Sequence, residues 1–200
     1  MKKEVVLVFQ KNAILGKVKT RLASGMGELR ALEIYGYLVQ MTYSALAEVP
    51  ASIWTYFSDF IPETVNSPIA KSFAQEGQDL GERMAHAFSR SFESGMEKVV
   101  LIGTDCPTLQ SHHLHEAFEA LTHSDLVLGP ATDGGYYLIG MKCRSDYLFA
   151  GIAWSTAEVL AQTLAVATAH GLHFTLLDEL SDIDTQEDWE RYRSQIEIIG

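Results

Sequence analysis

Two runs of apolar residues constrain the fold of this chain most strongly. Residues 5–9 read Val-Val-Leu-Val-Phe and residues 99–102 read Val-Val-Leu-Ile, so neither run alternates with polar residues. Strands that are apolar on both faces lie inside a largely parallel sheet whose two faces are covered by helices. Both runs therefore predict buried strands, and the second run predicts a strand in the centre of the sheet.

Segments with helical spacing separate the strand-like segments. Leu32, Tyr35, Val39, Thr42 and Leu46 recur every three to four residues, and this pattern ends near Pro50. Alternation of strands and helices predicts an α/β fold with a largely parallel sheet. The link between the strands near 128 and 136 is short, so that pair is expected to be antiparallel and the sheet mixed. The expected strands cover residues 4–10, 53–57, 71–74, 98–103, 125–128, 136–141 and 174–177.

Several helix starts have capping patterns, in which a short polar side chain precedes a glutamate by three residues. We expect Asp79, Ser155 and Asp184 each to cap a helix in this way. Ser111 is expected to cap a further helix without the glutamate.

Length and composition restrict the class of protein. The 200 residues favour one domain that covers residues 1–200. The formal net charge of −11 argues against a nucleic-acid partner, which would need a basic face, but leaves room for a nucleotide at a local cluster of cations. Neither a run long enough to span a membrane nor a secretory leader is recognisable, which predicts a cytoplasmic protein. Two cysteines are too few for a disulfide framework.

The segment Gly16–Arg21 gathers cations in this acidic chain. Lys19, Thr20 and Arg21 follow the first expected strand closely, and Gly16 lets the backbone turn. Lysine supplies a point charge and arginine a planar fork of donors, so a phosphate or diphosphate is the natural ligand. The alternative is a solvated basic loop without a ligand.

Asp105 is the strongest candidate for a metal-binding acid. It follows the most hydrophobic strand, in Gly103-Thr104-Asp105-Cys106-Pro107. Ligands of open α/β sheets bind outside the carboxyl ends of the strands. A carboxylate at that position, opposite the Lys19 and Arg21 loop, is suited to hold Mg²⁺ or Mn²⁺ against a diphosphate. The alternative is that Asp105 caps the turn before Pro107.

A second candidate constellation is Asp133-Gly134-Gly135-Tyr136-Tyr137. The glycines allow a close approach of the backbone to a ligand, although Asp-Gly is also a strong hairpin signal. Tyr136, Tyr137 and Trp154 could stack on a sugar or a base, and alternation along a strand lets only one of the two tyrosines face the site. The segment Trp154-Ser155-Thr156 opens a helix, whose N-terminus could attract an anion. Asp182 precedes the last helix and is not explained by capping alone.

Six motifs in this order resemble the glycosyltransferase-A-like proteins found beside radical-SAM and arsenosugar-type gene clusters. The resemblance covers nearly the whole chain. One departure is that residues 12–15 hold no proline, which weakens any role transferred to Lys11. The motifs are Gly16–Leu22, Gln75–Met84 (with Gly81 and Arg83), Gly103–Leu109, Gly129–Gly140, Trp154–Thr156 and Asp182–Trp189.

The resemblance implies a nucleotide-diphospho-sugar transferase fold, which is a three-layer α/β/α sandwich with a mixed, mostly parallel sheet. It implies a nucleotide or nucleotide-sugar ligand and Mg²⁺ or Mn²⁺ as cofactor. Asp105 would be the metal-binding and catalytic acid, and Asp133 would face the transferred group. Nucleotide and phosphate contacts would come from Gly16, Lys19, Thr20, Arg21, Gly81 and Arg83, and substrate contacts from Gly134, Gly135, Tyr136 and Trp154.

Together these features predict a metal-assisted glycosyltransferase that uses a nucleotide-sugar donor and a small-molecule acceptor. One alternative is a nucleotidyltransferase that joins a nucleoside triphosphate to a small phosphorylated acceptor, because the fold and the phosphate-binding loop would serve both reactions. Another is a nucleotide-binding protein without catalytic activity. The base, the sugar, the acceptor and the oligomeric state are not encoded in any recognisable motif.

Overall fold

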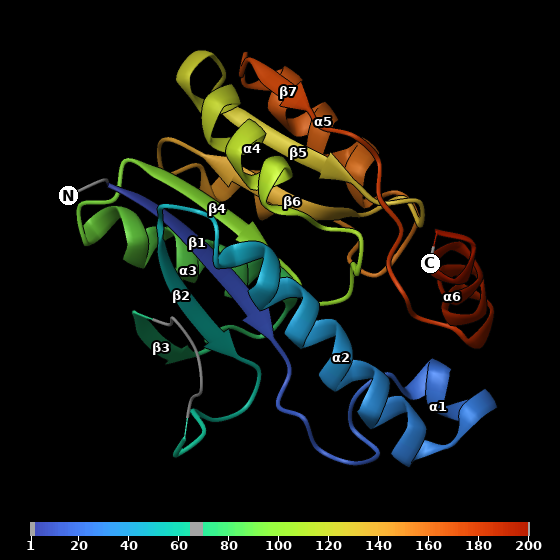
Figure 1. Ribbon diagram of the computed structural model, residues 1–200. Coiled ribbons are helices and arrows are strands. Elements are labelled where there is room, and N and C mark those ends of the chain that lie inside the picture. The colour runs from blue at the N-terminus through green and yellow to red at the C-terminus, as the bar shows by residue number, and fades with distance from the viewer. Residues whose placement is uncertain (1–2, 65–69, 200) are drawn as a thin grey trace.

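The computed structural model describes residues 3–64 and 70–199, and its centre is one mixed sheet. The described residues form seven strands in the order β3-β2-β1-β4-β6-β5-β7 (Figure 1). All neighbouring pairs are parallel except the two that involve β6, which confirms a mixed, mostly parallel sheet. The strands are β1 (Glu4–Gln10), β2 (Ser52–Phe57), β3 (Lys71–Ala74), β4 (Lys98–Ile102), β5 (Leu126–Pro130), β6 (Tyr136–Met141) and β7 (Phe174–Leu176).

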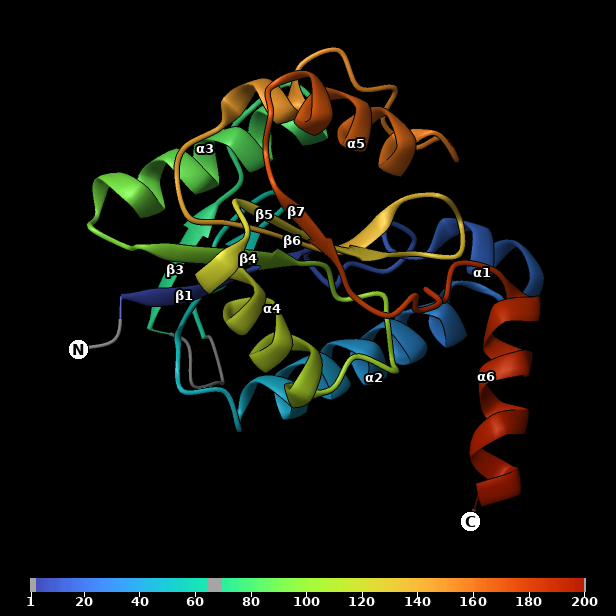
Figure 2. The ribbon, with the colours of Figure 1, turned by 90° about the horizontal axis from the view of Figure 1, so that it is seen from above.

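Helices cover both faces of the sheet and make the expected three layers. Seen from above, α3 and α5 lie on one side of the sheet, and α2 and α4 lie on the other (Figure 2). The helices are α1 (Thr20–Met26), α2 (Glu28–Leu46), α3 (Leu80–Glu93), α4 (Ser111–His123), the short 3-10 helix η1 (Asp146–Phe149), α5 (Val159–Ala169) and α6 (Gln186–Ile199). No helix among the described residues is long and apolar enough to cross a membrane.

The two apolar runs form the centre of the sheet, as expected. Val5 and Leu7 of β1 pack into the core beneath α3, whereas Val6 and Val8 pack into the core beneath α2 and α4. All four side chains are fully buried. Successive side chains of a strand point to opposite faces, so a strand with two buried faces needs apolar residues at every position.

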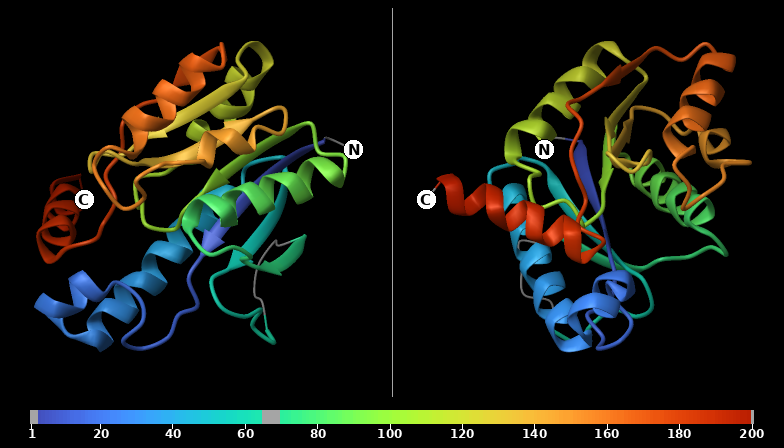
Figure 3. Two further views of the ribbon diagram at one scale, coloured as in Figure 1. Left: turned by 180° about the vertical axis from the view of Figure 1, so that it is seen from behind. Right: turned by 90° about the vertical axis from the view of Figure 1, so that its right-hand side faces the viewer.

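A third, smaller core joins α1, α2 and α6 at the carboxyl end of the sheet. Leu22, Ile34, Leu38 and Trp189 pack there against Ile183, which precedes α6. Figure 3 shows α6 beside α1, away from the amino-terminal end of β1. This cluster holds the loop between β1 and α1 against the segment between β7 and α6, although these segments are more than 150 residues apart in the sequence.

The structure confirms one of the predicted capping patterns. Asp79 begins α3, where its carboxylate accepts a hydrogen bond from the Glu82 N–H at 2.8 Å. The Glu82 carboxylate in turn accepts from the Gln78 N–H at 2.8 Å. These bonds satisfy backbone donors that the first turn of a helix leaves unpaired.

The other three capping predictions are wrong in their residue. Ser155 has a φ of +64° and lies outside α5, which begins only at Val159. At α6 the cap lies one residue later than expected, because the Thr185 hydroxyl accepts from the Asp188 N–H at 3.2 Å and the Asp188 carboxylate accepts from the Thr185 N–H at 2.9 Å. At α4, Gln110 precedes the first turn, while the Ser111 hydroxyl donates to Glu48 at 2.9 Å.

Candidate active site

A two-lobed cleft lies at the carboxyl ends of β1 and β4, where open α/β sheets bind ligands. The larger, polar lobe has a volume of about 580 Å³, and the smaller lobe has a volume of about 320 Å³. Apolar side chains including Phe9, Met84 and Leu101 line much of the smaller lobe, which we call the apolar lobe. Both lobes are lined by Lys11, Leu80, Asp105, Tyr136 and Asp182, so they form one continuous cleft.

Lys19 and Asp105 meet in the polar lobe, as the two sequence motifs predicted. The Lys19 ammonium lies 2.7 Å from Asp105 Oδ1 and donates a second hydrogen bond, at 2.5 Å, to the carbonyl of Ile183. Lys19 has a φ of +48° and is the residue before α1. Its side chain is only 5% exposed, compared with 43% for Asp105. The lysine is therefore a buried connection between three segments as well as a cation of the cleft.

Asp182 is a further acid of the site that the predicted set of site residues did not contain. Burial, together with the neighbouring Asp105 carboxylate, raises its pKa to about 7, although Lys19 acts in the opposite direction. Its Oδ1 is buried and has no hydrogen-bond partner in the described residues. Its position just before the last helix was the available signal, but nothing in the local sequence shows that this segment returns to the carboxyl end of β4.

Arg21 and Thr20 line the polar lobe, and Gly16 does not. The Arg21 guanidinium forms an ion pair with Asp184 at 2.7 Å, and its side chain is 72% exposed. Asp184 therefore holds a cleft cation rather than capping α6. Gly16 has a φ of +76°, a conformation that favours glycine, so its contribution is the turn itself.

The Asp133 segment forms the tip of the antiparallel hairpin between β5 and β6. Asp133 lines the polar lobe, and its carboxylate accepts from the Gly135 N–H at 2.9 Å. Gly134 has a φ of +88°, and a Cβ there would lie 2.1 Å from the Ala157 carbonyl oxygen. Only glycine fits this contact, through which the hairpin tip packs on the segment before α5. Gly134 is therefore a packing residue, whereas Gly135 lines the lobe.

Gly81 is likewise a packing residue of the cleft wall rather than a lining residue. A Cβ at Gly81 would lie 2.6 Å from the Trp154 indole nitrogen and 2.9 Å from the Phe149 carbonyl oxygen. Trp154, which packs on this glycine, lines the polar lobe. The small residue thus allows α3 to approach the tryptophan closely.

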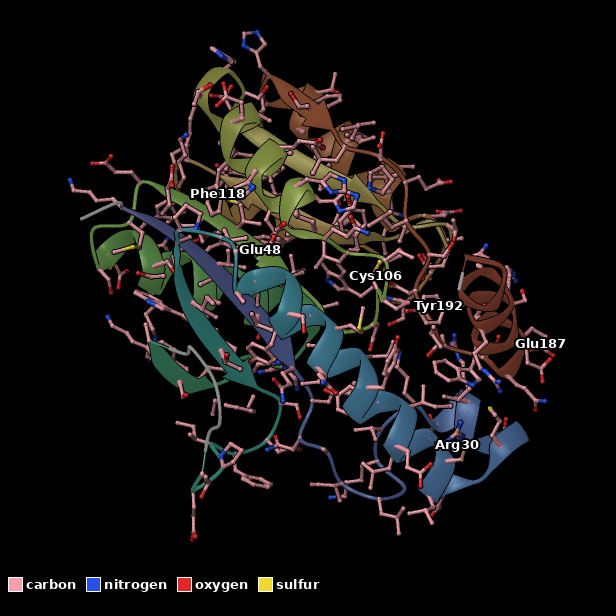
Figure 4. The ribbon with its side chains drawn as sticks, viewed as in Figure 1. Arg30, Glu48, Cys106, Phe118, Glu187 and Tyr192 are labelled. Carbon is pink, nitrogen blue, oxygen red and sulfur yellow. The ribbon has the colours of Figure 1, made fainter. Side chains whose placement is uncertain are left out.

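Tyr136, Tyr137 and Arg83 line the apolar lobe. We expected only one of the two tyrosines to face the site. This expectation holds for the polar lobe, which is lined by Tyr136 and not by Tyr137, but it is wrong for the apolar lobe, which both tyrosines line. The reason is that this lobe opens at the end of the sheet, where side chains from both faces reach it. Cys106, in the loop that leaves β4 (Figure 4), also lines the lobe, and burial raises its thiol pKa to about 11, which makes it a poor nucleophile.

The acids of the cleft fit a divalent cation in part. Among the described residues there is no preassembled group of three metal-ligating side chains. Mg²⁺, however, commonly takes only one or two protein carboxylates and completes its shell with substrate phosphates and water. The Asp105 carboxylate and the unpartnered oxygen of Asp182 supply the hard oxygen donors that such an ion prefers.

The chain is similar to proteins that handle nucleotides. A solved structure from Desulfovibrio desulfuricans G20, described as a candidate nucleotide-diphospho-sugar transferase, has 34% sequence identity and a TM-score of 0.86, and the match covers 92% of this chain and 84% of that chain. The 2-phospho-L-lactate guanylyltransferase of Methanocaldococcus vulcanius is 21% identical over 179 residues, which cover 87% of this chain and 78% of the relative.

Two more distant solved structures share the fold. The 4-diphosphocytidyl-2C-methyl-D-erythritol synthase of Anaerococcus prevotii has 9% identity and a TM-score of 0.62, covering 98% of this chain and all of that chain. A manganese complex of Rv0371c from Mycobacterium tuberculosis has 12% identity and a TM-score of 0.53, and the match covers 94% of this chain and 96% of that chain.

A model of the family described as "Uncharacterized protein conserved in bacteria (DUF2064)" matches residues 48–156, more than half of the chain.

Proposed function

We propose that this chain, which belongs to the DUF2064 family, transfers a nucleotidyl group from a nucleoside triphosphate to a small phosphorylated acceptor. The observation that carries the proposal is the two-lobed cleft. Its apolar lobe suits a planar base, and its polar lobe is lined by the three cations Lys11, Lys19 and Arg21. One nucleotide could place its base and its phosphates in these two environments at once.

The likeness to a guanylyltransferase favours nucleotidyl transfer over the glycosyl transfer that the sequence motifs first suggested. Glycosyl transfer from a nucleotide sugar is supported by the fold and by the description of the Desulfovibrio structure. Under either reaction the protein is a transferase. The association with radical-SAM gene clusters stays a prediction from the motifs.

Nucleotidyl transfer requires that an acceptor phosphate oxygen attack the α-phosphorus while the bond from that phosphorus to the bridging oxygen breaks and pyrophosphate leaves. In this cleft, Arg21 and Lys11 would bind the phosphates and hold the attacking oxygen, the α-phosphorus and the departing bridging oxygen in line. Such catalysis consists mainly of positioning and of electrostatic stabilisation of the departing charge. No side chain has to remove a proton from an acceptor phosphate, which is already ionised at neutral pH.

The position of Asp133 bears on this difference between the reactions. A hydroxyl acceptor in glycosyl transfer would need a base or an orienting carboxylate, and Asp133 at the hairpin tip would fill that role. A phosphate acceptor needs no base, so Asp133 would then only position substrate. The cost of Asp133→Asn therefore differs between the two reactions.

Mg²⁺ or Mn²⁺, held by Asp105 and Asp182, would supply Lewis-acid neutralisation of the triphosphate when bound. The manganese complex of Rv0371c supports divalent metal use on this fold. Lys19 would keep the Asp105 carboxylate oriented toward the lobe.

Product analysis tests the proposal directly. The purified protein is incubated with each nucleoside triphosphate and a panel of small phosphorylated acceptors in the presence of Mn²⁺, and pyrophosphate release is measured. Asp105→Asn serves as the inactive variant and Cys143→Ser, an exposed position outside the cleft, as the matched control. We expect pyrophosphate with the parent and the control protein only. Release of nucleoside diphosphate from nucleotide sugars would show glycosyl transfer instead, and calorimetric binding without any product would show a nucleotide-binding protein.

A further inference from the structure

We propose that the apolar lobe selects guanine, and that Gln75 and Arg83 are the residues that recognise it. This inference rests on the proposed function in one respect, namely that a nucleotide base occupies the apolar lobe. Both residues line that lobe, and they come from neighbouring segments, because Gln75 follows β3 and Arg83 lies in the first turn of α3.

The Gln75 side chain offers the lobe an acceptor. Its amide nitrogen donates to the backbone carbonyl of Tyr56 at 3.0 Å. A carbonyl can only accept, so this bond fixes which end of the amide is nitrogen. The amide oxygen is then the end that has no partner in the described structure, and it can accept a hydrogen bond from a base N–H.

The Arg83 side chain offers the lobe a fork of donors. Its Nε donates to the Gly77 carbonyl at 3.1 Å, which holds the plane of the guanidinium. Gly77 packs closely on the start of α3, because a Cβ at Gly77 would lie 2.7 Å from the backbone nitrogen of Arg83. The two terminal nitrogens of Arg83 form no ion pair with a described residue, and they remain able to bind two adjacent acceptors.

Two hydroxyl side chains of this lobe are already engaged. The Ser58 hydroxyl is bonded to Asp59 and Asn12, and the Thr104 hydroxyl faces the Tyr35 hydroxyl at 3.4 Å. Lys11 lines both lobes, so it lies where base and phosphates meet. Asp105, Asp182 and Tyr136 likewise line both lobes. In the part of the apolar lobe that is not shared with the polar lobe, the pattern that we assign to the base is one acceptor from Gln75 and one donor fork from Arg83.

Guanine matches this pattern. Its O6 and N7 are adjacent acceptors, the pair that arginine binds bidentately, and its N1–H and N2 amine are donors that need an acceptor such as Gln75 Oε1. Adenine is read by a glutamine that donates to N7 and accepts from N6. Adenine, however, presents its N6 amine beside N7, and the donor fork of Arg83 has no acceptor for that amine. A two-ring base also fills more of the 320 Å³ lobe than a pyrimidine does.

Calorimetric titration of the full chain with GTP, ATP, CTP and UTP tests the assignment without requiring turnover. We expect GTP to bind at least about tenfold more tightly than the other three, as one bidentate base contact provides. 7-Deaza-GTP, which lacks the N7 acceptor, tests the arginine separately. It should bind the parent protein several-fold more weakly than GTP. Arg83→Met, which has no donor for N7, should bind GTP and 7-deaza-GTP equally. Arg90→Met is the matched control, because Arg90 pairs with Glu76 outside the lobe, so this variant should keep the difference.

Gln75→Leu tests the acceptor in the same assay, and we expect it to lose most of the preference for GTP while a thermal melt shows a folded protein. The inference is overturned if GTP binds no more tightly than CTP, or if 7-deaza-GTP is disfavoured equally in the parent and in Arg83→Met. These outcomes are distinct from failure of the proposed function. Tight GTP binding without pyrophosphate release leaves the base assignment intact, whereas pyrophosphate release with a preference for CTP leaves the reaction intact and removes the assignment.

Discussion

The Lys19 ammonium lies 2.7 Å from Asp105 Oδ1, so the acid that we assign to a divalent cation already has a cation beside it. The same ammonium is bonded to the Ile183 carbonyl, and the Ile183 N–H donates to the Asp105 carbonyl at 2.9 Å. These three contacts connect the loop after β1, the end of β4 and the segment before α6. A single buried lysine thus couples the shape of the cleft to the charge at its centre.

Lys19→Met removes this connection while it keeps an unbranched side chain. We expect the free energy of unfolding to fall by about 1.5–3 kcal/mol, the range for hydrogen bonds to charged groups. Nucleotide affinity should fall as well, because the loop after β1 loses its anchor. Chemical denaturation and calorimetry measure the two effects, and a variant with unchanged stability would show that Lys19 is only a surface cation of the cleft.

Arg21→Ala separates the binding of phosphate from folding. The Arg21 side chain is 72% exposed, so its loss should leave stability nearly unchanged despite the ion pair with Asp184. We expect nucleotide affinity to weaken by about 1.5–3 kcal/mol through the lost charge-assisted hydrogen bonds. Arg30→Ala is the control, since Arg30 lies at the outer end of α2 and pairs with Glu33 (Figure 4). Equal nucleotide affinity in the parent and in Arg21→Ala would show that the segment Gly16–Arg21 is a solvated basic loop that does not bind the phosphates.

Asp105→Asn tests the metal assignment. The change keeps the size of the side chain and removes its charge, so we expect a folded protein that binds nucleotide weakly and gains no affinity from Mn²⁺. Nucleotide titrations with Mn²⁺ and with a chelator, in the parent and the variant, give the comparison. An equal effect of Mn²⁺ on both proteins would leave Asp105 as a turn residue before Pro107.

Asp182→Asn should change how stability depends on pH. The pKa of Asp182 is about 7 in the folded protein and near 4 in an unfolded chain, so between these values the folded state binds more protons. The contribution of this group therefore lowers the free energy of unfolding as the pH rises from about 4 to 7. Without divalent metal, we expect the free energy of unfolding of the variant at pH 8 to exceed that of the parent by at least about 1 kcal/mol, since one pKa unit corresponds to about 1.4 kcal/mol.

The control for this pH effect is Asp178→Asn, which changes an exposed acid of the same segment. Denaturant melts at pH 4.5 and pH 8 should give the same difference from the parent at both values for Asp178→Asn. A pH-independent difference for Asp182→Asn as well would show that its carboxyl titrates normally.

The corrected helix starts give a prediction of stability. Thr185→Ala should cost about 1 kcal/mol by removing the cap of α6, and Thr185→Ser should restore most of it. Ser155→Gly should be neutral or stabilising, because Ser155 has a positive φ that glycine adopts without strain. Thermal or denaturant melts of the parent and these variants measure the differences in stability. A loss on Ser155→Gly as large as that on Thr185→Ala would return the capping role to Ser155.

The sequence by itself determined the elements and their layers. Apolar runs at residues 5–9 and 99–102 required buried strands, and the helical periodicity between strands required helices that cover the sheet. It also located the cations after β1 and the acid after β4, because the carboxyl ends of parallel strands meet at one edge. These features depend on side-chain periodicity and on strand direction, both of which are local properties of the chain.

Only the tertiary structure decided how these residues share their roles. Lys19 turned inward to Asp105 and Ile183 because α6 packs against α1 and α2 in a separate small core. Asp182 entered the cleft for the same reason, and its raised pKa is a consequence of burial beside Asp105. Gly81 lacks a side chain where the Trp154 indole packs, so its role is packing rather than contact with a phosphate. Each of these relationships joins segments far apart in the sequence, and local propensity does not encode the packing that brings them together.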